Sequence, residues 1–152
     1  MASVVVRRAS ESDLEALISL YHELAADKTT AAPGGRDSSE SLLTEILADP
    51  RRELAVAVVD GQLVGTADLL VVPNLTHRGD PWAVVENVIV ASSARRTGVG
   101  RALMTHLIEL ARAAGCYKLQ LASGKHRTEA HEFYRSMGFN AVAEGFKIYF
   151  DE

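Results

Sequence analysis

The sequence has one cysteine, four prolines and no long apolar run. Cys116 has no second cysteine with which to form an internal disulfide, so a reducing compartment is expected and the cytoplasm is the predicted location. No stretch approaches the roughly 20 apolar residues that span a bilayer. The arginines among the first eight residues follow valines, so we expect neither a membrane span nor a signal peptide.

The sequence also has fewer basic than acidic residues, 16 against 20. The formal net charge is −4 and the sequence pI is about 5.7, which argues against a nucleic-acid binder and mildly favours cationic partners such as amines. With 152 residues, 47% of them hydrophobic and 24% charged, the chain has the make-up of an ordinary globular protein. We expect a single domain over residues 1 to 152, and homodimerisation remains open.

The first third of the chain predicts a strand, two helices and a loop. A valine run at residues 4 to 6 precedes Ser12 and Glu15, whose spacing is that of a capping box. Apolar residues then recur every three or four positions to about Ala26, which predicts a helix. A loop over residues 28 to 39 and a short helix over 41 to 48 follow.

The remaining pattern predicts a mixed sheet. Asp60-Gly61 between two apolar runs is typical of a hairpin with a type I′ turn. Gly115 stands where a helix-ending glycine belongs. The expected elements are strands at 54 to 59, 62 to 72, 82 to 90, 117 to 121 and 143 to 150, a loop at 73 to 81, and helices at 98 to 114 and 128 to 137. This is an α/β (α+β) fold with a mostly antiparallel sheet of six to seven strands and about four helices.

The most informative segment is the glycine-containing loop over residues 95 to 101, between a strand and a helix. Residues without bulky side chains let several backbone N–H groups point at one anion, and the helix adds its positive end, so a pyrophosphate is the natural ligand. Arg101 and Ala102 after Gly100 exclude a Walker A loop, and Leu103 excludes a dinucleotide fingerprint. A tight turn carrying solvated arginines is the alternative.

These residues carry a resemblance to a known family. Arg-x-x-Gly-x-Gly, ending at Gly100 and preceded by Glu86-Asn87-Val88-Ile89-Val90, is similar to the coenzyme A signature of the GNAT superfamily of N-acetyltransferases. Phe133-Tyr134 followed by Gly138-Phe139 resembles that family's next helix and turn. The chain is broadly similar to aminoalkylphosphonate and other small-amine acetyltransferases, although many family members have Asn where this chain has Arg127.

The resemblance implies acetyl-CoA as cofactor and transfer of its acetyl group to a primary amine of a small molecule, by direct attack through a tetrahedral intermediate. It places the thioester carbonyl at the backbone of the central strand. The expected cofactor-binding residues are Val88, Ile89, Val90, Arg95, Arg96, Thr97, Gly98, Val99, Gly100, Arg101, Arg127, His131 and Phe133.

Two side chains are candidates for proton transfer. Tyr134 is in the family's tyrosine position and is expected to protonate the leaving thiolate; a core aromatic beside Phe133 is the alternative. Glu86 lies in an otherwise apolar strand, where burial would raise its pKa toward that of a useful base. An inert strand-face carboxylate is the competing interpretation.

Position alone suggests acceptor-binding residues near the two loops. They are Tyr21, Asp68, Asn74, His77 and Trp82, although an outward-facing Asp68 is the simpler expectation. His126 and His131 lack the His-Glu-x-x-His spacing of a zinc helix, so no metal is expected. Cys116 is expected to be a small buried residue rather than a nucleophile.

Two other functions remain open. One is acetylation of a lysine or of the amino terminus of a protein or peptide. The other is a non-catalytic domain that senses coenzyme A.

Overall fold

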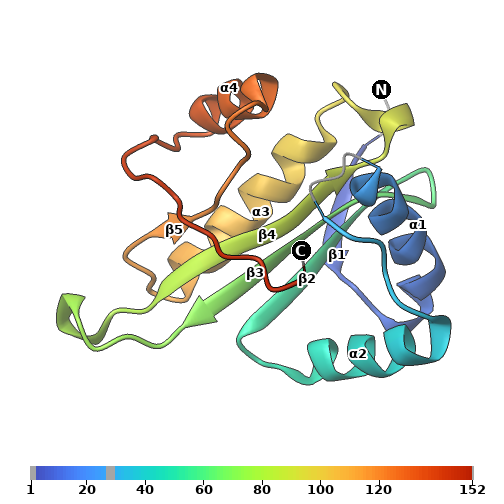
Figure 1. Cartoon of the computed structure of the whole chain (residues 1–152), viewed down its shortest axis with the longest axis horizontal. Helices are drawn as coiled ribbons and strands as arrows, with labels where there is room; N and C mark the ends of the chain where they lie inside the picture. The colour runs from blue at the N-terminus through green and yellow to red at the C-terminus, as the bar shows by residue number, and fades with distance from the viewer. Residues whose placement is uncertain (1–2, 27–29, 152) are drawn as a thin grey trace. The chain divides into compact units, whose positions relative to one another are not determined.

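A computed structural model describes residues 3 to 26 and 30 to 151 (Figure 1). Contacts between residues divide the chain into two compact units, Met1–Leu121 and Ala122–Glu152. Each unit is described by itself below. In the described ranges, no helix is both long and apolar enough to cross a membrane.

The first unit is built on one sheet with the strand order β1-β2-β3-β4-β5. The first four strands are antiparallel and β5 pairs with β4 in parallel. The strands are β1 (Val5–Arg8), β2 (Arg52–Val59), β3 (Gln62–Val72), β4 (Trp82–Val90) and β5 (Leu119–Gln120). The helices of this unit are α1 (Leu14–Ala25), α2 (Arg36–Ala48) and α3 (Val99–Ala113), with 3-10 turns η1 (Glu11–Asp13), η2 (His77–Gly79) and η3 (Ser92–Ala94).

The predicted hairpin between β2 and β3 is confirmed. Val59 pairs with Gln62, and the two turn residues Asp60 and Gly61 both have positive φ, at 50° and 75°. This is the backbone of a type I′ turn, whose twist matches that of the strands it joins. The predicted strand at 82 to 90 is also confirmed at both ends.

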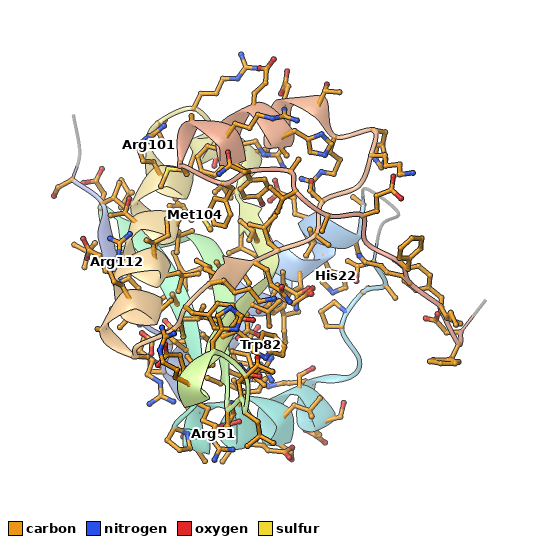
Figure 2. The ribbon with its side chains drawn as sticks, turned by 90° about the vertical axis from the view of Figure 1, so that its left-hand side faces the viewer. His22, Arg51, Trp82, Arg101, Met104 and Arg112 are labelled. Carbon is orange, nitrogen blue, oxygen red and sulfur yellow. The ribbon has the colours of Figure 1, made fainter. Side chains whose placement is uncertain are left out.

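Helices cover both faces of the sheet (Figure 1). Leu54 and Val56 of β2 pack with Leu14 and Leu17 of α1 and Leu43 of α2. Side chains alternate between faces along a strand, so the alanines of β2 face the other way, toward α3. The core on that side includes Leu103, Met104 and Leu107 of α3, all fully buried. In Figure 2, Met104 lies between Arg101 and Arg112, two exposed residues of the same helix.

One close approach on the α3 face requires a glycine. A Cβ atom at Gly65 of β3 would lie 3.0 Å from both Val99 Cγ1 and Leu103 Cδ1. Real Cβ atoms rarely come closer than this, so the bare backbone of Gly65 lets the first turns of α3 lie directly on the sheet. The position of α3 therefore depends on this residue.

The first helical segment starts earlier than predicted. The residues that act as a capping box are Ser10 and Asp13 rather than Ser12 and Glu15. The Ser10 N–H donates to the Asp13 carboxylate at 2.8 Å, and Arg7 donates to the same carboxylate at 2.8 and 2.9 Å. The bond from the Ser10 N–H satisfies a backbone donor that the helix itself cannot pair. The bonds from Arg7 hold the Asp13 carboxylate in this capping position.

Two other predictions were wrong, the start of the second helix and the last strand. Helix α2 begins at Arg36, so the loop predicted over 28 to 39 is shorter; residues 27 to 29 lie outside the described part of the chain. The strand predicted at 143 to 150 is not a strand, and the described sheet has five strands instead of six to seven. The apolar side chains of that segment, Phe146, Ile148 and Phe150, are at least 81% exposed.

The second unit contains α4 (Thr128–Ser136), which ends in a Schellman turn. Gly138, at φ 100°, donates its N–H to the Arg135 carbonyl at 3.0 Å, and Phe139 donates to the Tyr134 carbonyl at 3.1 Å. The positive φ explains why glycine follows Met137. In the first unit, α3 ends in the same way, with Gly115 at φ 80°.

Candidate active site

Strand β4 carries a bulge. Its residues pair with β3 as Glu86 with Asp68 and Ile89 with Thr66, so two residues of β4, Asn87 and Val88, face one residue of β3. Asn87 has a positive φ of 52°. A bulge of this kind bends the strand and re-aims its backbone groups.

The other edge of β4 is open for most of its length. Strand β5 pairs with Ala83 and Val84 alone. In the part of the chain that the structure describes, residues 85 to 90 therefore have no strand partner on this side. The bulge and the open edge together leave this part of the β4 backbone distorted and, among the described residues, without a strand partner on one side.

The glycine loop after β4 has the backbone of an anion site. Gly98 has a left-handed conformation, with φ 91° and ψ 1°, and is the N-cap of α3. Arg96 also has a positive φ, at 62°. The loop from Arg95 to Gly98 is exposed. In the first turn of α3, Gly100 and Ala102 are half-buried, and Val99 anchors the turn in the core. The first N–H groups of a helix have no acceptor in a preceding helical turn, and a helix start after a glycine loop is a common position for a bound phosphate.

A glutamate of α1 braces this loop. Glu23 Oε1 accepts a hydrogen bond of 2.6 Å from the Ser92 backbone N–H and lies 3.7 Å from Arg95 Nη2. Arg95 Nε also donates to the Val90 carbonyl at 3.2 Å. Arg95 therefore ties the loop to β4 and to α1. Nothing in the sequence pattern pointed to Glu23, because it lies 69 positions before Ser92.

A cavity of about 260 Å³ opens between α1, α2 and the sheet, and we call it the α1–α2 cavity. Most of its wall is apolar, and this wall includes Leu14, Leu17, Ile18, Leu43, Ile46 and Leu54. Its polar lining includes Tyr21, Arg52, Asp68 and Asn87. Because Asn87 belongs to the bulge, the cavity extends to the distorted part of β4.

An ion pair stands in the polar wall of the α1–α2 cavity. Arg52 Nε donates to the two oxygens of Asp68 at 2.9 and 3.2 Å, and Arg52 Nη2 donates to Oδ2 at 2.5 Å. The hydrogen bonds to Asp68 raise the pKa of Arg52 above its usual value. Asp68 is 5% exposed, so the expectation that it faces outward was wrong.

Tyr21 is the other titratable group of the cavity wall. Burial raises its pKa to about 12, and the negative charge of Asp68 adds to the shift. The phenol therefore stays protonated at neutral pH and acts as a hydrogen-bond donor rather than as a base. The structure thus brings Tyr21 and Asp68, both named from position, to the same cavity.

Glu86 lies on the cavity side of the sheet but is exposed. It is directly opposite Asp68, which is itself opposite Leu54, so the three residues form one rung across β4, β3 and β2 on one face. The expectation that Glu86 is buried in an apolar strand was wrong. Glu86 is the last regularly paired residue of β4 before the bulge at Asn87.

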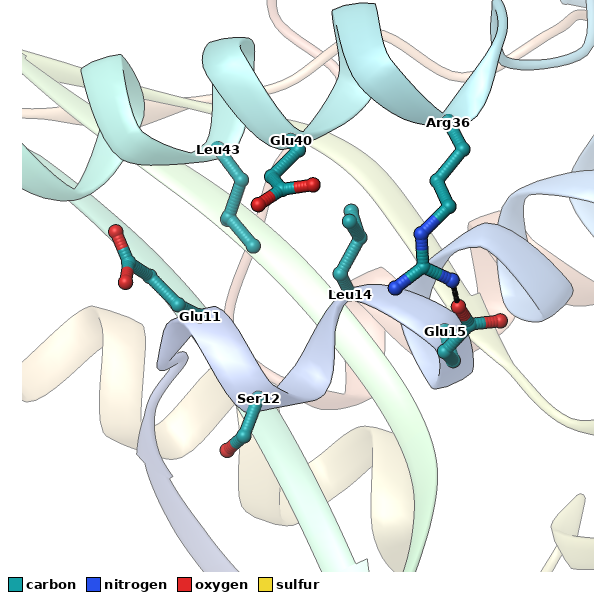
Figure 3. A pocket seen from close by; sticks show the side chains of 7 residues that line it. All are labelled: Glu11, Ser12, Leu14, Glu15, Arg36, Glu40 and Leu43. Carbon is teal, nitrogen blue, oxygen red and sulfur yellow. Dashed lines mark ion pairs between the residues drawn. The ribbon is translucent and has the colours of Figure 1, made fainter.

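A second hollow, of about 150 Å³, lies between η1 and α2 (Figure 3). Three glutamates line it, Glu11, Glu15 and Glu40, and Arg36 forms an ion pair with Glu15. Leu14 and Leu43 line both this hollow and the α1–α2 cavity. In the described ranges, no group of three or more potential ligands could hold a metal ion.

The second unit groups four of the predicted residues around α4. Tyr134 packs against Phe133 and Phe139, with ring centroids 5.4 and 5.9 Å apart. Burial raises the pKa of Tyr134, and the charge of Arg127 partly opposes this. The His131 ring Nε2 lies 2.8 Å from the Gly124 carbonyl oxygen, to which it donates.

The loop before β4 does not contribute to the α1–α2 cavity. Asn74 Nδ2 donates to the carbonyls of Thr76 and Asp80 and so holds the loop itself. His77 stacks on Tyr117, with centroids 3.6 Å apart. Trp82 is the first residue of β4, whereas the glycine loop follows the last residue of that strand. Figure 2 shows Trp82 far from Arg101, which belongs to the glycine loop.

Cys116 is partly exposed and unpaired, and burial raises the pKa of its thiol. A reactive cysteine needs the opposite shift. The expectation that Cys116 is a buried residue was wrong, because it follows the end of α3 at a half-exposed position.

Comparison with known proteins agrees with this geometry. The model of the acetyltransferase (GNAT) family matches residues 17 to 139. A glucosamine 6-phosphate N-acetyltransferase of Trypanosoma brucei brucei is 35% identical over 101 residues, which cover 62% of this chain and 67% of that protein. An aminoglycoside N(6′)-acetyltransferase type 1 of Stenotrophomonas maltophilia is 31% identical over 110 residues, or 70% of this chain and 71% of that protein.

Among solved structures, a candidate acetyltransferase from Agrobacterium tumefaciens strain C58 has 36% identity and a TM-score of 0.87. The match covers 95% of this chain and 99% of that chain. The fold and the site thus define an acyltransferase of the N-acetyltransferase class. The chain belongs to the GNAT family of acetyltransferases.

Proposed function

We propose that this protein transfers an acetyl group from acetyl-CoA to a primary amine of a small molecule. The observation that carries the proposal is the α1–α2 cavity, which extends to the bulge of β4 and has Glu86 on the same face of the sheet. An acceptor in this cavity would have its amine beside backbone donors and a carboxylate.

The loop over residues 95 to 101 fits the diphosphate of coenzyme A. The N-terminus of α3 would supply backbone N–H groups, and Gly98 adopts a conformation that side chains disfavour. Acetyl-CoA supplies the acetyl group as a thioester. Backbone N–H groups of Val88 to Val90, at the open edge of β4, would stabilise negative charge on the acetyl oxygen. Arg127, His131 and Phe133 of the second unit remain proposed coenzyme contacts by family resemblance.

Proton transfer would involve Glu86 and Tyr134. An amine with a pKa near the ~10.4 of lysine is almost wholly protonated at neutral pH, so it must lose a proton before it attacks. Glu86 is solvent-accessible and takes this proton directly or through water. Tyr134, which burial keeps protonated, donates a proton to the departing thiolate.

The dimensions of the cavity favour a small acceptor. Its volume of about 260 Å³ is slightly below the ~300–1,000 Å³ of pockets that take drug-sized ligands. Two relatives are named for small acceptors, glucosamine 6-phosphate and aminoglycosides. Both observations favour a small-molecule amine over a protein or peptide.

Release of free thiol from acetyl-CoA, measured with a panel of small amines and a panel of peptides, tests the proposal. We expect release with small amines, well above the rate without acceptor. Faster release with the peptides would support the protein-acetylating alternative. Binding of coenzyme A without release by either panel would indicate a sensor domain instead.

A further inference from the structure

Asp68 occupies only one edge of the Arg52 guanidinium. A guanidinium has five N–H donors in a planar fork. Asp68 accepts from Nε and from Nη2, which leaves Nη1 and one hydrogen of Nη2. Among the described residues, Nη1 of Arg52 has no hydrogen-bond acceptor and no ion-pair partner.

The free edge of Arg52 belongs to the α1–α2 cavity. The Arg52 side chain is 34% exposed, whereas that of Asp68 is 6% exposed, so the carboxylate lies behind the guanidinium as seen from solvent. Two parallel hydrogen bonds donated to a buried carboxylate fix the plane of the guanidinium. Arg52 is therefore a pre-oriented, permanently charged donor in a wall that is otherwise mostly apolar.

We propose that Arg52 binds an anionic group of the acceptor, so that the substrate is an amine that also carries a carboxylate or a phosphate. This proposal rests on the proposed function, because it specifies what the α1–α2 cavity accepts. Both anions match the planar fork of arginine. Asp68 is a positioning residue, since it orients Arg52 and has no direct contact with the anion.

The sheet sets the separation between the two charges of the acceptor. The amine would lie beside Glu86 on β4, and the anion would lie beside the guanidinium that Asp68 holds over β3 and β2. Neighbouring strands are ~4.8 Å apart, so amine and anion are separated by roughly 5–10 Å. This span is longer than that of an α-amino acid, whose two charged groups share one carbon atom.

The apolar wall supports the same substrate class. Leu14, Leu17, Ile18 and Leu54 line the cavity between its polar groups. A carbon skeleton that joins the amine to the anion would bury apolar surface against these side chains. Chains of several methylene groups and phosphorylated amino sugars both have such skeletons.

Matched pairs of acceptors test the proposal. One pair is 6-aminohexanoate and pentylamine, which differ by the carboxylate. The other is glucosamine 6-phosphate and glucosamine, which differ by the phosphate. We expect the wild type to have a KM roughly 10- to 100-fold lower for the anionic member of at least one pair, the range of a charge-assisted hydrogen bond. The pair that shows the preference identifies the anion.

Variants of Arg52 locate the preference. Arg52→Met should remove the preference by raising KM for the anionic member at least tenfold more than KM for the neutral member. Arg52→Lys keeps a charge without the fork and should be intermediate. Arg51→Met is the matched control, because Arg51 is the adjacent exposed arginine and does not line the cavity (Figure 2).

Two controls distinguish a failure of this proposal from a failure of the variant to fold and from a failure of the proposed function. Melting temperature and acetyl-CoA binding report whether Arg52→Met folds, and Arg52→Lys carries the test if it does not. Calorimetric titration of 6-aminohexanoate and glucosamine 6-phosphate measures binding without chemistry. Equal wild-type kcat/KM within both pairs, no binding of either anion, or a preference that survives Arg52→Met would each overturn the role of Arg52. Binding that depends on Arg52 without thiol release would overturn the proposed function alone.

Discussion

Asp68 of β3 and Glu86 of β4 are directly opposite each other, on the face of the sheet that bears the α1–α2 cavity. Like charges in this arrangement repel. Arg52 neutralises Asp68 through one edge of its guanidinium, Nε and Nη2, which leaves Glu86 as the carboxylate without a cation among the described residues. The two acidic residues therefore differ in environment: Asp68 is buried and paired with an arginine, and Glu86 is exposed.

Replacing Glu86 tests its role as a base. Glu86→Gln should lower kcat/KM by roughly 10²–10⁴, the usual contribution of a general base, and should abolish the acidic limb of the pH–rate profile. Coenzyme affinity should be unchanged. If the variant keeps its acidic limb, another group accepts the proton.

Replacing Tyr134 tests its role as an acid. Tyr134→Phe keeps the ring that packs against Phe133 and Phe139 but removes the phenol proton. We expect kcat to fall roughly 10²–10⁴-fold with little change in melting temperature. Steady-state turnover with acetyl-CoA and calorimetry of unfolding measure the two quantities. Unchanged turnover would make Tyr134 a core aromatic.

Valine substitutions of the two glycines that flank α3 distinguish an effect of backbone strain from an effect on coenzyme binding. Gly98 and Gly115 both have positive φ, and a Cβ atom at either would meet no atom within 4 Å. Either valine substitution should thus lower the free energy of unfolding by about 1–2 kcal/mol through backbone strain. Only Gly98→Val should also abolish binding of coenzyme A, measured by calorimetry. Equal loss of affinity in both variants would contradict the placement of the diphosphate.

Gly65 sets the distance between α3 and the sheet. Gly65→Val would push against Val99 and Leu103, both buried, and should lower the free energy of unfolding by about 1–3 kcal/mol, as overpacking does. Chemical denaturation measures this change. Because Val99 begins α3, coenzyme affinity should fall as well. Gly79→Ala, with open space around its Cβ position, is a control that probes backbone strain alone.

The start of α1 should be sensitive to acid. Hydrogen bonds from Arg7 and Ser10 lower the pKa of Asp13 below its usual value, so Asp13 binds protons less readily in the folded state. Its contribution to stability is therefore complete above about pH 4, near the unfolded pKa, and is lost as the pH falls through the lower folded value. Asp13→Asn should lower the melting temperature at pH 7 more than at pH 3. An equal decrease at both values would contradict this linkage.

Local signals predicted most of the elements of the first unit. Asp60-Gly61 predicted its turn because a type I′ backbone needs positive φ at both positions, which these residues tolerate. Gly115 predicted the end of α3 for the same reason. The capping residues were misassigned because Ser12-x-x-Glu15 and Ser10-x-x-Asp13 are equally plausible by spacing. The donors supplied by Arg7 favour Asp13 in the folded chain.

The candidate site was only partly predictable. The glycine loop is continuous in sequence, so its pattern is visible there. The pairing of Arg52 with Asp68 joins residues 16 positions apart, and the brace from Glu23 to Ser92 joins residues 69 positions apart. No local pattern specifies such partners, so Arg52, Glu23 and the packing role of Gly65 were missed.

By itself, the sequence determined the hairpin, the strand that carries Glu86, the glycine loop and the helix after it, because turns, caps and hydrophobic periodicity depend on neighbouring residues. The tertiary structure decided which side chains face one another. Glu86 is exposed beside the bulge at Asn87, and the pairing of β2 with β3 placed Arg52 against a buried Asp68. These outcomes depend on strand register, which forms only when distant parts of the chain pair.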